Sequence, residues 1–531
     1  MKKRISLLLA VTMLMASVAG CGGSSGDSKA AETTAAAAAA ETTAAAESAA
    51  SESTEVTYKE SVTIGTSAQI SVIDPQGQSN LQHDQLFKMS HDRLVAYNHE
   101  TGEIEPELAE SWEISDDGLV YTFKLVEGAA FHDGSAFTAN DVVYTINRGY
   151  DSAVVVAKLK SLDTVEAVDD YTVKMTLKAP NVDWLMNLSN CVFSMLSENA
   201  CTVDAANGAS IGTGAWIIKD FSASNYVTVV RNDNYWGELP VTKEVTLRYI
   251  AENATRLISL QNGEIDMCID PSTSELSFIT EDENLDLVEY QSSTSTFLCF
   301  NTSVAPGNNA DLRRAIAHAI NIEDVIIAAT NGYATVAEHF WGPNTYGYDD
   351  TIVPYEYNLD LAKEYMAKAG YPDGGVSIKV LVNGSERMTA LQVIQSQLAE
   401  IGVEIVIEEV DSAGISAATS FASPTHEAML YYTSWNYEGD DCRRMFYTDS
   451  NVNKAIYVNQ EVIDLVDKAV TLSDDAERKA VYSQIQNIVH EDAPWIPLYF
   501  GTKCVAINKN LSGVVYEPNQ RHDFTYVKVA E

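Results

Sequence analysis

The sequence predicts an α/β protein with two differently organised regions behind a non-globular N-terminus. Up to about residue 295, short alternating apolar runs joined by turn residues predict hairpins and a mixed α/β region. After about Thr296, helical patterns alternate with strand patterns. In one place an amphipathic helix at residues 391–401 ends at Gly402 and is followed at once by the strand pattern of residues 403–407. This order is typical of the second half of a strand-helix-strand unit.

The first twenty-one residues have the pattern of an export signal. Basic residues 2–4 precede an apolar stretch at residues 5–16, which is too short to span a membrane, and small residues lead to Cys21. The last four residues, Val-Ala-Gly-Cys, resemble a bacterial lipobox, which implies that Cys21 carries lipid and becomes the first residue. The alternative is an ordinary signal peptide with a stray cysteine.

Residues 22–57 contain almost no large apolar side chains, since Gly, Ser, Ala, Thr and Glu dominate. Such a segment cannot bury enough surface to offset its ordering entropy, so it is expected to be a flexible linker. We therefore expect a soluble body from residue 58 onward, held by a lipid at the outer face of a bacterial cell membrane.

The composition excludes several classes of partner. With 75 acidic against 34 basic residues, the net charge of -41 argues against nucleic acid and against adsorption to anionic membranes. Beyond Cys21 no two cysteines form a Cys-x-x-Cys pair, which argues against a zinc site. Both disulfides and free thiols stay open for Cys191, Cys201, Cys268, Cys299, Cys442 and Cys504.

Local signals place the main elements in chain order. The first region is expected to hold a strand at residues 61–68, hairpins around 116–125 and 164–177, and a helix that starts at Thr138 with Asp141 three residues on. The second region is expected to hold helices at residues 311–329, 358–369 and 476–490, the last leading into a strand at 495–500.

No catalytic or metal-binding constellation is expected. Residues 208–212 fit Gly-x-Ser-x-Gly around Ser210, but a loop precedes them and a strand pattern follows, whereas that nucleophile needs a strand before and a helix after. His132, in His-Asp-Gly, is first a turn residue. Phosphate-binding, His-Glu-x-x-His and EF-hand patterns do not occur, so no cofactor is expected.

Several separated stretches together form a recognisable set: residues 105–112 (EPELAESW), 121–125 (YTFKL), 131–134 (FHDG), 137–143 (FTANDVV), 230–237 (VRNDNYWG), 260–266 (LQNGEID) and 300–303 (FNTS). These stretches resemble one family, the extracellular solute-binding proteins, family 5, of ABC importers, which includes oligopeptide, dipeptide and nickel receptors. The resemblance covers nearly all of the chain after the linker.

The resemblance implies a two-lobed fold of the periplasmic-binding-protein type II, with an extra subdomain in lobe I. It implies a receptor that captures a short peptide between its lobes and delivers it to membrane permease subunits with their ATPase, and we expect a monomer. The implied division is a signal at 1–20, lipidated Cys21 and linker at 21–57, lobe I core at 58–104, 209–295 and 497–531, inserted subdomain at 105–208, and lobe II at 296–496.

The stretch after the apolar run 428–432 is the predicted ligand site. Peptide receptors of this family hold the peptide's ammonium group with the aspartate of a Trp-x-x-Asp turn. This chain has Trp435 but Glu438 three residues on, and Asp440 or Asp441 are alternatives for the same role. The other interpretation is a solvated acidic loop with Trp435 in the core.

Three further residues are predicted to contact ligand. Arg387, just before the helix at 391, resembles in position an arginine of dipeptide receptors that receives a carboxylate, although a solvated residue near a helix start is equally consistent. Trp341 and Tyr437 are candidate apolar walls, although aromatic side chains are more often core.

Two alternative functions stay open. The same kind of receptor might be built for another solute, such as an oligosaccharide or a nickel chelate, because glutamate replaces the family's aspartate. The remote alternative is a surface hydrolase that uses Ser210.

Overall fold

The computed structural model describes residues 56–99, 101–343, 345–435, 444–448, 450 and 452–531, and the residues from Val56 onward form one compact unit. In this part of the chain the largest sheet has eleven strands in the order β15-β14-β16-β12-β17-β11-β1-β10-β9-β8, and β13 pairs with β17 beside this path. None of the helices in the described residues is long and apolar enough to cross a membrane.

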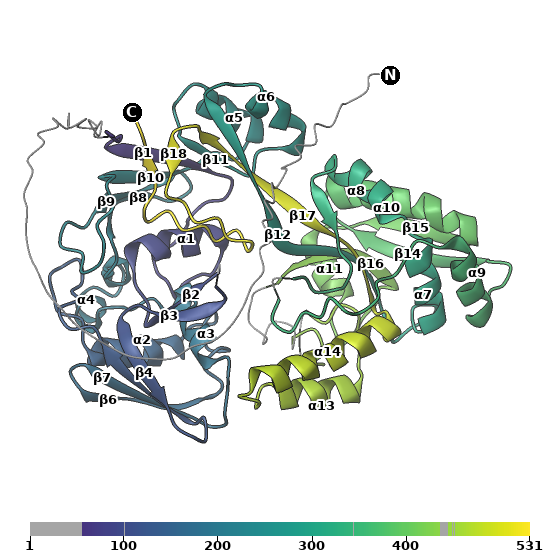
Figure 1. Ribbon diagram of the computed structural model, residues 1–531, viewed down its shortest axis with the longest axis horizontal. Helices are drawn as coiled ribbons and strands as arrows, with labels where there is room; N and C mark the ends of the chain where they lie inside the picture. Colours follow the sequence, from purple (N-terminus) through teal and green to yellow (C-terminus); the bar gives the residue numbers. More distant parts are fainter. Residues whose placement is uncertain (1–55, 100, 344, 436–443, 449, 451) are drawn as a thin grey trace, which may run out of the picture. The chain divides into compact units, whose positions relative to one another are not determined.

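Two long strands, β12 (Leu285–Phe300) and β17 (Trp495–Asn508), join the two halves of this sheet (Figure 1). We call the half that contains β11, β1, β10, β9 and β8 lobe I, and the half that contains β16, β14 and β15 lobe II. The chain passes into lobe II through β12 and returns through β17, as the predicted C-terminal strands require. The residue boundaries of the predicted domains stay a prediction.

Lobe I begins with the predicted N-terminal strand, which pairs in parallel with β10 and β11. β10 alternates buried and less buried residues, whereas all three residues of β11 are buried. Its elements are β1 (Ser61–Thr66), α1 (Leu81–Ser90), β8 (Trp216–Ser222), β9 (Tyr226–Arg231), β10 (Glu244–Tyr249), α5 (Asn253–Gln261), β11 (Met267–Ile269), α6 (Leu276–Thr280), β18 (Leu511–Ser512) and β19 (Lys528–Val529).

A separate four-stranded antiparallel sheet in the order β4-β5-β7-β6 confirms the predicted hairpins. Its helix α2 begins at the predicted capping box, in which the Asp141 carboxylate accepts from the Thr138 backbone N–H at 2.9 Å. We call the stretch between α1 and β8 the small-sheet part of lobe I. Besides this four-stranded sheet it holds the two-stranded sheet of β2 (Val95–Asn98) and β3 (Glu103–Pro106). Its other elements are β4 (Ala109–Ile114), β5 (Val120–Leu125), α2 (Ala139–Gly149), β6 (Leu162–Asp169), β7 (Thr172–Leu177), α3 (Trp184–Leu188) and α4 (Glu198–Val203).

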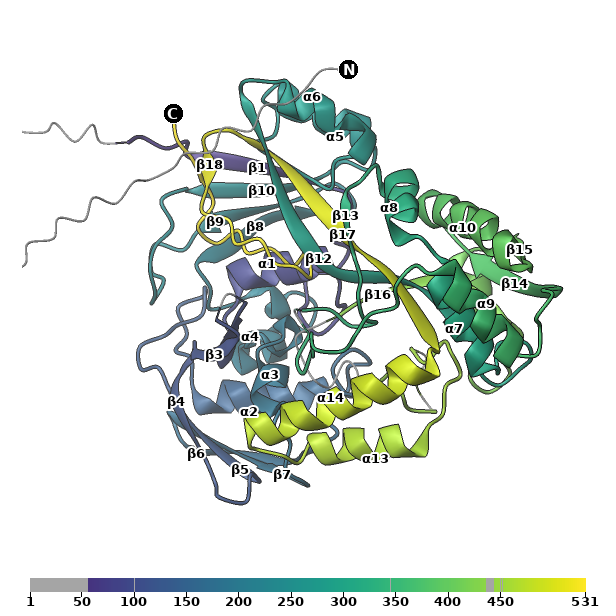
Figure 2. The same cartoon turned by 45° about the vertical axis from the view of Figure 1, so that its right-hand side comes forward.

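Lobe II confirms the strand-helix-strand prediction, because β14 and β15 are parallel and helix α10 connects them through Gly402 at φ +74°. Figure 2 shows α10 lying against β14 and β15. Its elements are α7 (Ala310–Ala319), α8 (Ile322–Thr330), β13 (Ala334–Val336), α9 (Leu359–Lys368), β14 (Val376–Val382), α10 (Ser385–Leu398), β15 (Val403–Glu409), α11 (Ser412–Ala418), β16 (Ala428–Ser434), α13 (Gln460–Ala469) and α14 (Asp475–Asp492).

Two helix predictions in lobe II are wrong in their extent. The single helix expected at residues 311–329 is two helices, because Ile320 has extended backbone and the Asn321 side chain caps α8 by accepting from the Asp324 N–H. Helix α10 begins at Ser385, six residues earlier than expected, so Arg387 lies inside its first turn.

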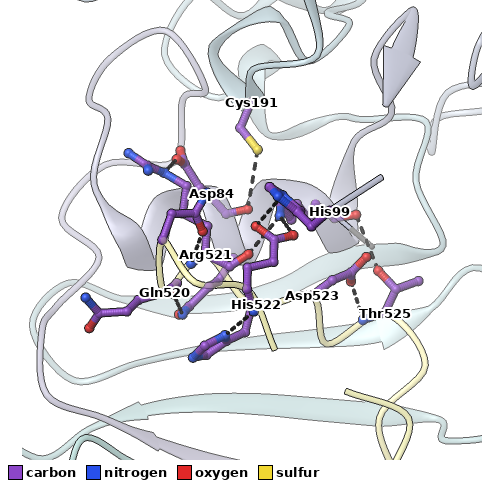
Figure 3. A network of polar contacts seen from close by, with 12 residues as sticks. Asp84, His99, Cys191, Gln520, Arg521, His522, Asp523 and Thr525 are labelled. Carbon is purple, nitrogen blue, oxygen red and sulfur yellow. Dashed lines mark hydrogen bonds and ion pairs between the residues drawn. The ribbon is translucent and has the colours of Figure 1, made fainter. Parts of the chain in front are cut away.

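The C-terminal segment is tied to α1 by charged side chains (Figure 3). Glu517 lies against the Lys88 ammonium and 2.9 Å from His99 Nε2, and the Arg521 guanidinium pairs with Asp84. These contacts join positions more than four hundred residues apart along the chain, so they hold the returning C-terminus in lobe I. The cysteines among the described residues are buried free thiols, of which Cys191 lies beside this network.

Candidate ligand-binding cleft

A cavity of about 780 Å³ is lined by residues from both lobes. This volume lies within the roughly 300–1,000 Å³ of typical small-molecule pockets. Hydroxyl groups dominate its wall, with tyrosine rings and a few charges. The lining residues are Leu81, Asn253, Asp270–Thr273, Thr294, Thr296, Ala329, Thr330, Tyr333, Ser385–Arg387, Thr389, Tyr432, Ser434, Tyr499, Gly501–Cys504 and Gln520.

The long strands and one helix start position these side chains. Alternate residues of β12 and β16 point to the same face of the sheet, so Thr294 and Thr296 face the cavity beside Tyr432 and Ser434. The Thr294 and Ser434 hydroxyls are 2.7 Å apart. The first turn of α10 approaches the same cavity and brings Arg387 to it. The wall is therefore rich in polar groups held on regular elements.

Arg387 is a cation of the cleft without a carboxylate partner among the described residues. Its guanidinium carbon lies 4.4 Å from the centroid of the Tyr432 ring, and its Nη2 donates to Asn383 Oδ1 at 2.9 Å. Its Nε is buried and has no hydrogen-bond partner in the described part of the chain. A guanidinium held this way is oriented by neutral groups and keeps donor capacity for an anion.

The acidic groups of the cavity wall already have partners. Glu386 Oε1 accepts from the Tyr499 hydroxyl at 2.9 Å, and burial followed by the charge of Glu386 raises the pKa of Tyr499. Asp270 lies 3.9 Å from Lys503 Nζ. Asp270 and Lys503 thus compensate each other, whereas Glu386 has a neutral hydrogen-bond donor and Arg387 has neutral contacts in the described part of the chain.

The structure places Trp435 in the core. Its side chain is 2% exposed, its indole N–H donates to Ser295 Oγ at 2.8 Å, and its ring packs on Phe340. It therefore anchors the end of β16 next to the cleft and does not line the 780 Å³ cavity. Tyr437, Glu438, Asp440 and Asp441 lie outside the described residues, directly after a strand whose last residues line that cavity.

The prediction that Trp341 is a wall of the ligand site is wrong. Trp341 is fully buried, and its indole N–H donates to Gln486 within an aromatic cluster of lobe II. The predicted alternative, that such aromatics are core, holds here because Trp341 packs between Phe340 and Tyr482.

Glu386, Tyr499, Lys503 and Asp270 were missed from sequence. Glu386 is adjacent to Arg387, which is the signal that might have found it. The other three come from β17 and the turn after β11, and their meeting depends on strand pairings far apart in sequence, which no local pattern reveals.

Ser210 and His132, the residues considered for a hydrolase, are both hydrogen-bonded to backbone groups. Ser210 Oγ donates to the Asn207 carbonyl at 2.7 Å. His132 uses both ring nitrogens on the backbone of the Gly212–Gly214 turn, at 3.0 Å from Gly214 O and 3.3 Å from Gly212 N. Within the described residues no group of three or more His, Cys, Asp or Glu side chains could hold a metal ion.

Two α/β lobes joined by paired strands, with a polar cavity lined from both, define a type II binding protein. The family model "Bacterial extracellular solute-binding proteins, family 5 Middle" matches residues 103–454. The chain belongs to this family. It is therefore a substrate-binding protein of an ABC importer, a transport receptor and not an enzyme, of the extracellular or periplasmic kind.

Relatives with different solutes match over most of their length. The glutathione-binding protein GsiB of Escherichia coli is 29% identical over 482 residues, covering 88% of this chain and 94% of that protein. The heme-binding protein A of Haemophilus influenzae is 29% identical over 515 residues, covering 88% and 93%. The structure of DppA from Helicobacter pylori with the peptide STSA has a TM-score of 0.73 and 28% identity, covering 89% and 99%.

Proposed function

We propose that this receptor is held at the outer face of the cell membrane by lipid on Cys21, binds short peptides as a monomer and delivers them to its permease. The peptide's carboxylate pairs with Arg387. Its ammonium group pairs with Glu438, or with Asp440 or Asp441 close by in the sequence. Both charged ends of the peptide are thereby fixed, while the hydroxyl groups between them bind the backbone.

The observation that carries this proposal is Arg387. Its guanidinium lines the cavity, stacks on the Tyr432 ring and lacks a carboxylate partner in the described residues. Such a group is suited to bind an anionic group of the ligand. A bidentate arginine-carboxylate pair is among the stronger polar contacts in proteins. Charge-assisted hydrogen bonds of this kind contribute about 1.5–3 kcal/mol, which is roughly ten- to a hundredfold in affinity.

The relatives support the class of ligand. Peptide STSA is bound in the DppA structure, and GsiB is named for glutathione, a small peptide-like solute. A polar, hydroxyl-lined cavity fits such ligands better than a large apolar one. Heme-binding protein A is as similar as GsiB, so the ligand has to be measured directly.

The first experiment is native mass spectrometry of the purified chain, to weigh the small molecule that copurifies. Short-peptide masses are the expected result. An oligosaccharide mass, or a nickel chelate, would reject peptide and keep the receptor. Calorimetry with the tetrapeptide STSA and with reduced glutathione then measures affinity.

Matched ligands and variants test the two anchors. Arg387→Gln is expected to weaken STSA about ten- to a hundredfold and to leave its C-terminal amide nearly unaffected. Glu438→Gln is expected to weaken STSA far more than its N-acetyl form. Lys379→Gln is the control, because Lys379 is half exposed and pairs with Glu408 away from the cavity. If a variant loses the same affinity for STSA and for the form with the corresponding end blocked, the substituted residue does not bind that end of the peptide.

The lipid anchor is tested separately. In cells, Cys21→Ala is expected to move the protein from the membrane fraction to the medium, and intact mass spectrometry of the wild-type mature chain is expected to show an acylated N-terminal cysteine. An unmodified N-terminus would support an ordinary signal peptide.

A further inference from the structure

One buried ion pair joins the two lobes outside the cleft. Arg478 Nη2, in the first turns of α14, lies 2.6 Å from Asp183 Oδ1, directly before α3. The two side chains are 9% and 6% exposed. Helix α14 belongs to lobe II and α3 to the small-sheet part of lobe I. A backbone bond runs alongside, from Val182 N to Val470 O at 3.5 Å.

On the lobe I side, the aspartate is held by its own neighbours. The Asp183 N–H donates to Asn181 Oδ1 at 3.1 Å, and the Tyr121 hydroxyl donates to the Asn181 carbonyl at 3.1 Å. These bonds fix the backbone at Asp183, while the carboxylate itself is contacted by Arg478.

On the lobe II side, the guanidinium of Arg478 lies 4.2 Å from the centroid of the Tyr346 ring. Tyr346 is itself fixed by donating to Asp475 Oδ1 at 2.8 Å. The guanidinium is thus oriented within lobe II before it meets Asp183, which reduces the ordering entropy lost on contact.

An irregularity in the pairing of β12 with β17 provides a hinge between the lobes. In the pairing of β12 with β17, Gln291 is opposite Thr502 and Ser295 is opposite Phe500, so residues 292–294 stand against Gly501 alone. A bulge of this kind interrupts the ladder and bends the strands. It lies where the two halves of the sheet meet, and β12 and β17 are the strands through which the chain passes between lobes.

We propose that Asp183 and Arg478 form an inter-lobe latch that biases the free receptor towards its closed arrangement and so tunes solute affinity from outside the cleft. Opening about the bulge returns both charges to water, whereas closing desolvates and pairs them. The pairing is incomplete, because Asp183 Oδ2 and Arg478 Nε have no hydrogen-bond partner among the described residues. The ion pair therefore favours the closed arrangement without making it irreversible.

The bias acts on affinity through the population that is competent to hold solute. A ligand that contacts both lobes binds the closed arrangement, and its apparent affinity rises with the fraction already closed. This role rests on the receptor class and is independent of whether the solute is a peptide.

The test is single-molecule FRET on the full chain after removal of any copurified solute, which native mass spectrometry verifies, and without added ligand. Dyes are attached through non-natural amino acids at Val203 of lobe I and Val353 of lobe II, which are 80% and 79% exposed. Closed-to-open ratios are compared for wild type, Asp183→Asn, Arg478→Gln and the double variant. Thermal unfolding is recorded for each.

Each single variant leaves one unpaired charge to be buried on closing, so its closed-to-open ratio is expected to fall at least about tenfold. The double variant removes that penalty and is expected to lie between the single variants and wild type. The melting temperature stays unchanged, because the contact is broken in the open form of a folded chain.

The control pair is Arg148 with Asp74, a bidentate contact inside lobe I. Asp74→Asn is expected to lower the melting temperature and leave the FRET ratio unchanged. An unchanged closed-to-open ratio in Asp183→Asn and Arg478→Gln would overturn the proposal. Melting temperatures that fall together with the ratio would also overturn it, because a pair that only stabilises the fold would give that result.

Discussion

Replacing Glu517 by glutamine tests whether the C-terminal network stabilises lobe I through charge. Glu517 is 4% exposed and lies between the Lys88 ammonium and His99. Although burial alone raises its pKa, the charge of Lys88 and the contacts with His99 outweigh this and lower the pKa from 4.5 to about 2. The folded state therefore strongly favours the carboxylate form.

The magnitude follows from linkage. A fall in the pKa of Glu517 from 4.5 to about 2 corresponds to about 3 kcal/mol of folding free energy at pH 7. Because the folded pKa is the lower one, this contribution is complete above the unfolded value of 4.5 and is lost as the pH falls towards 2. At pH 3 about 1 kcal/mol remains.

The assay is equilibrium urea unfolding followed by circular dichroism at several pH values. Glu517→Gln is expected to be about 3 kcal/mol less stable than wild type at pH 7, and the difference narrows to about 1 kcal/mol at pH 3. Glu166→Gln is the control, because its pair with Lys174 is exposed and should contribute less than about 1 kcal/mol. A Glu517→Gln deficit that does not depend on pH would refute the electrostatic reasoning and leave packing as the cause.

Two further predictions concern the lobes separately. Burial and the neighbouring His339, His318 and Arg314 lower the pKa of His490 to about 4, so wild type loses stability as the pH falls from 6.5 to 4. His490→Phe, which keeps a ring to stack on Tyr355, should avoid about 1–2 kcal/mol of that loss at pH 4.5. A melting temperature with the same pH profile as wild type would contradict this. Gly214→Ala should destabilise lobe I by several kcal/mol or prevent folding, because its Cβ would lie 2.5 Å from the backbone of Ser90. The control is Gly501→Ala, whose Cβ would have no atom within 4 Å and which should unfold like wild type in the same melting experiment.

The elements that sequence predicted well are those set by neighbouring residues. The capping box of Thr138 and Asp141 and the helix stop at Gly402 depend on contacts within a few positions, so their patterns are complete in the sequence itself. The break at Asn321 was missed because the apolar residues run on through it, and only the extended backbone at Ile320 separates the two helices.

The candidate site was harder to predict, since its wall is assembled by strand pairing. Arg387 was found through a resemblance to dipeptide receptors, and the cavity does include it. Tyr499 and Lys503 reach the cavity because β17 crosses from one lobe to the other, and this is a property of the whole sheet. Trp341 was misplaced for the opposite reason, because an aromatic residue after a strand looks the same in sequence whether it faces a ligand or a core.

The chemistry of the inter-lobe contact suits a receptor that must also release its solute. An apolar interface of the same size would favour the closed arrangement strongly, and a receptor that stays closed without ligand cannot load. A buried ion pair behaves differently, because the desolvation of Asp183 and Arg478 nearly cancels their attraction. Its net preference for closing is therefore small, and the larger share of the closing free energy is left to contacts with the solute.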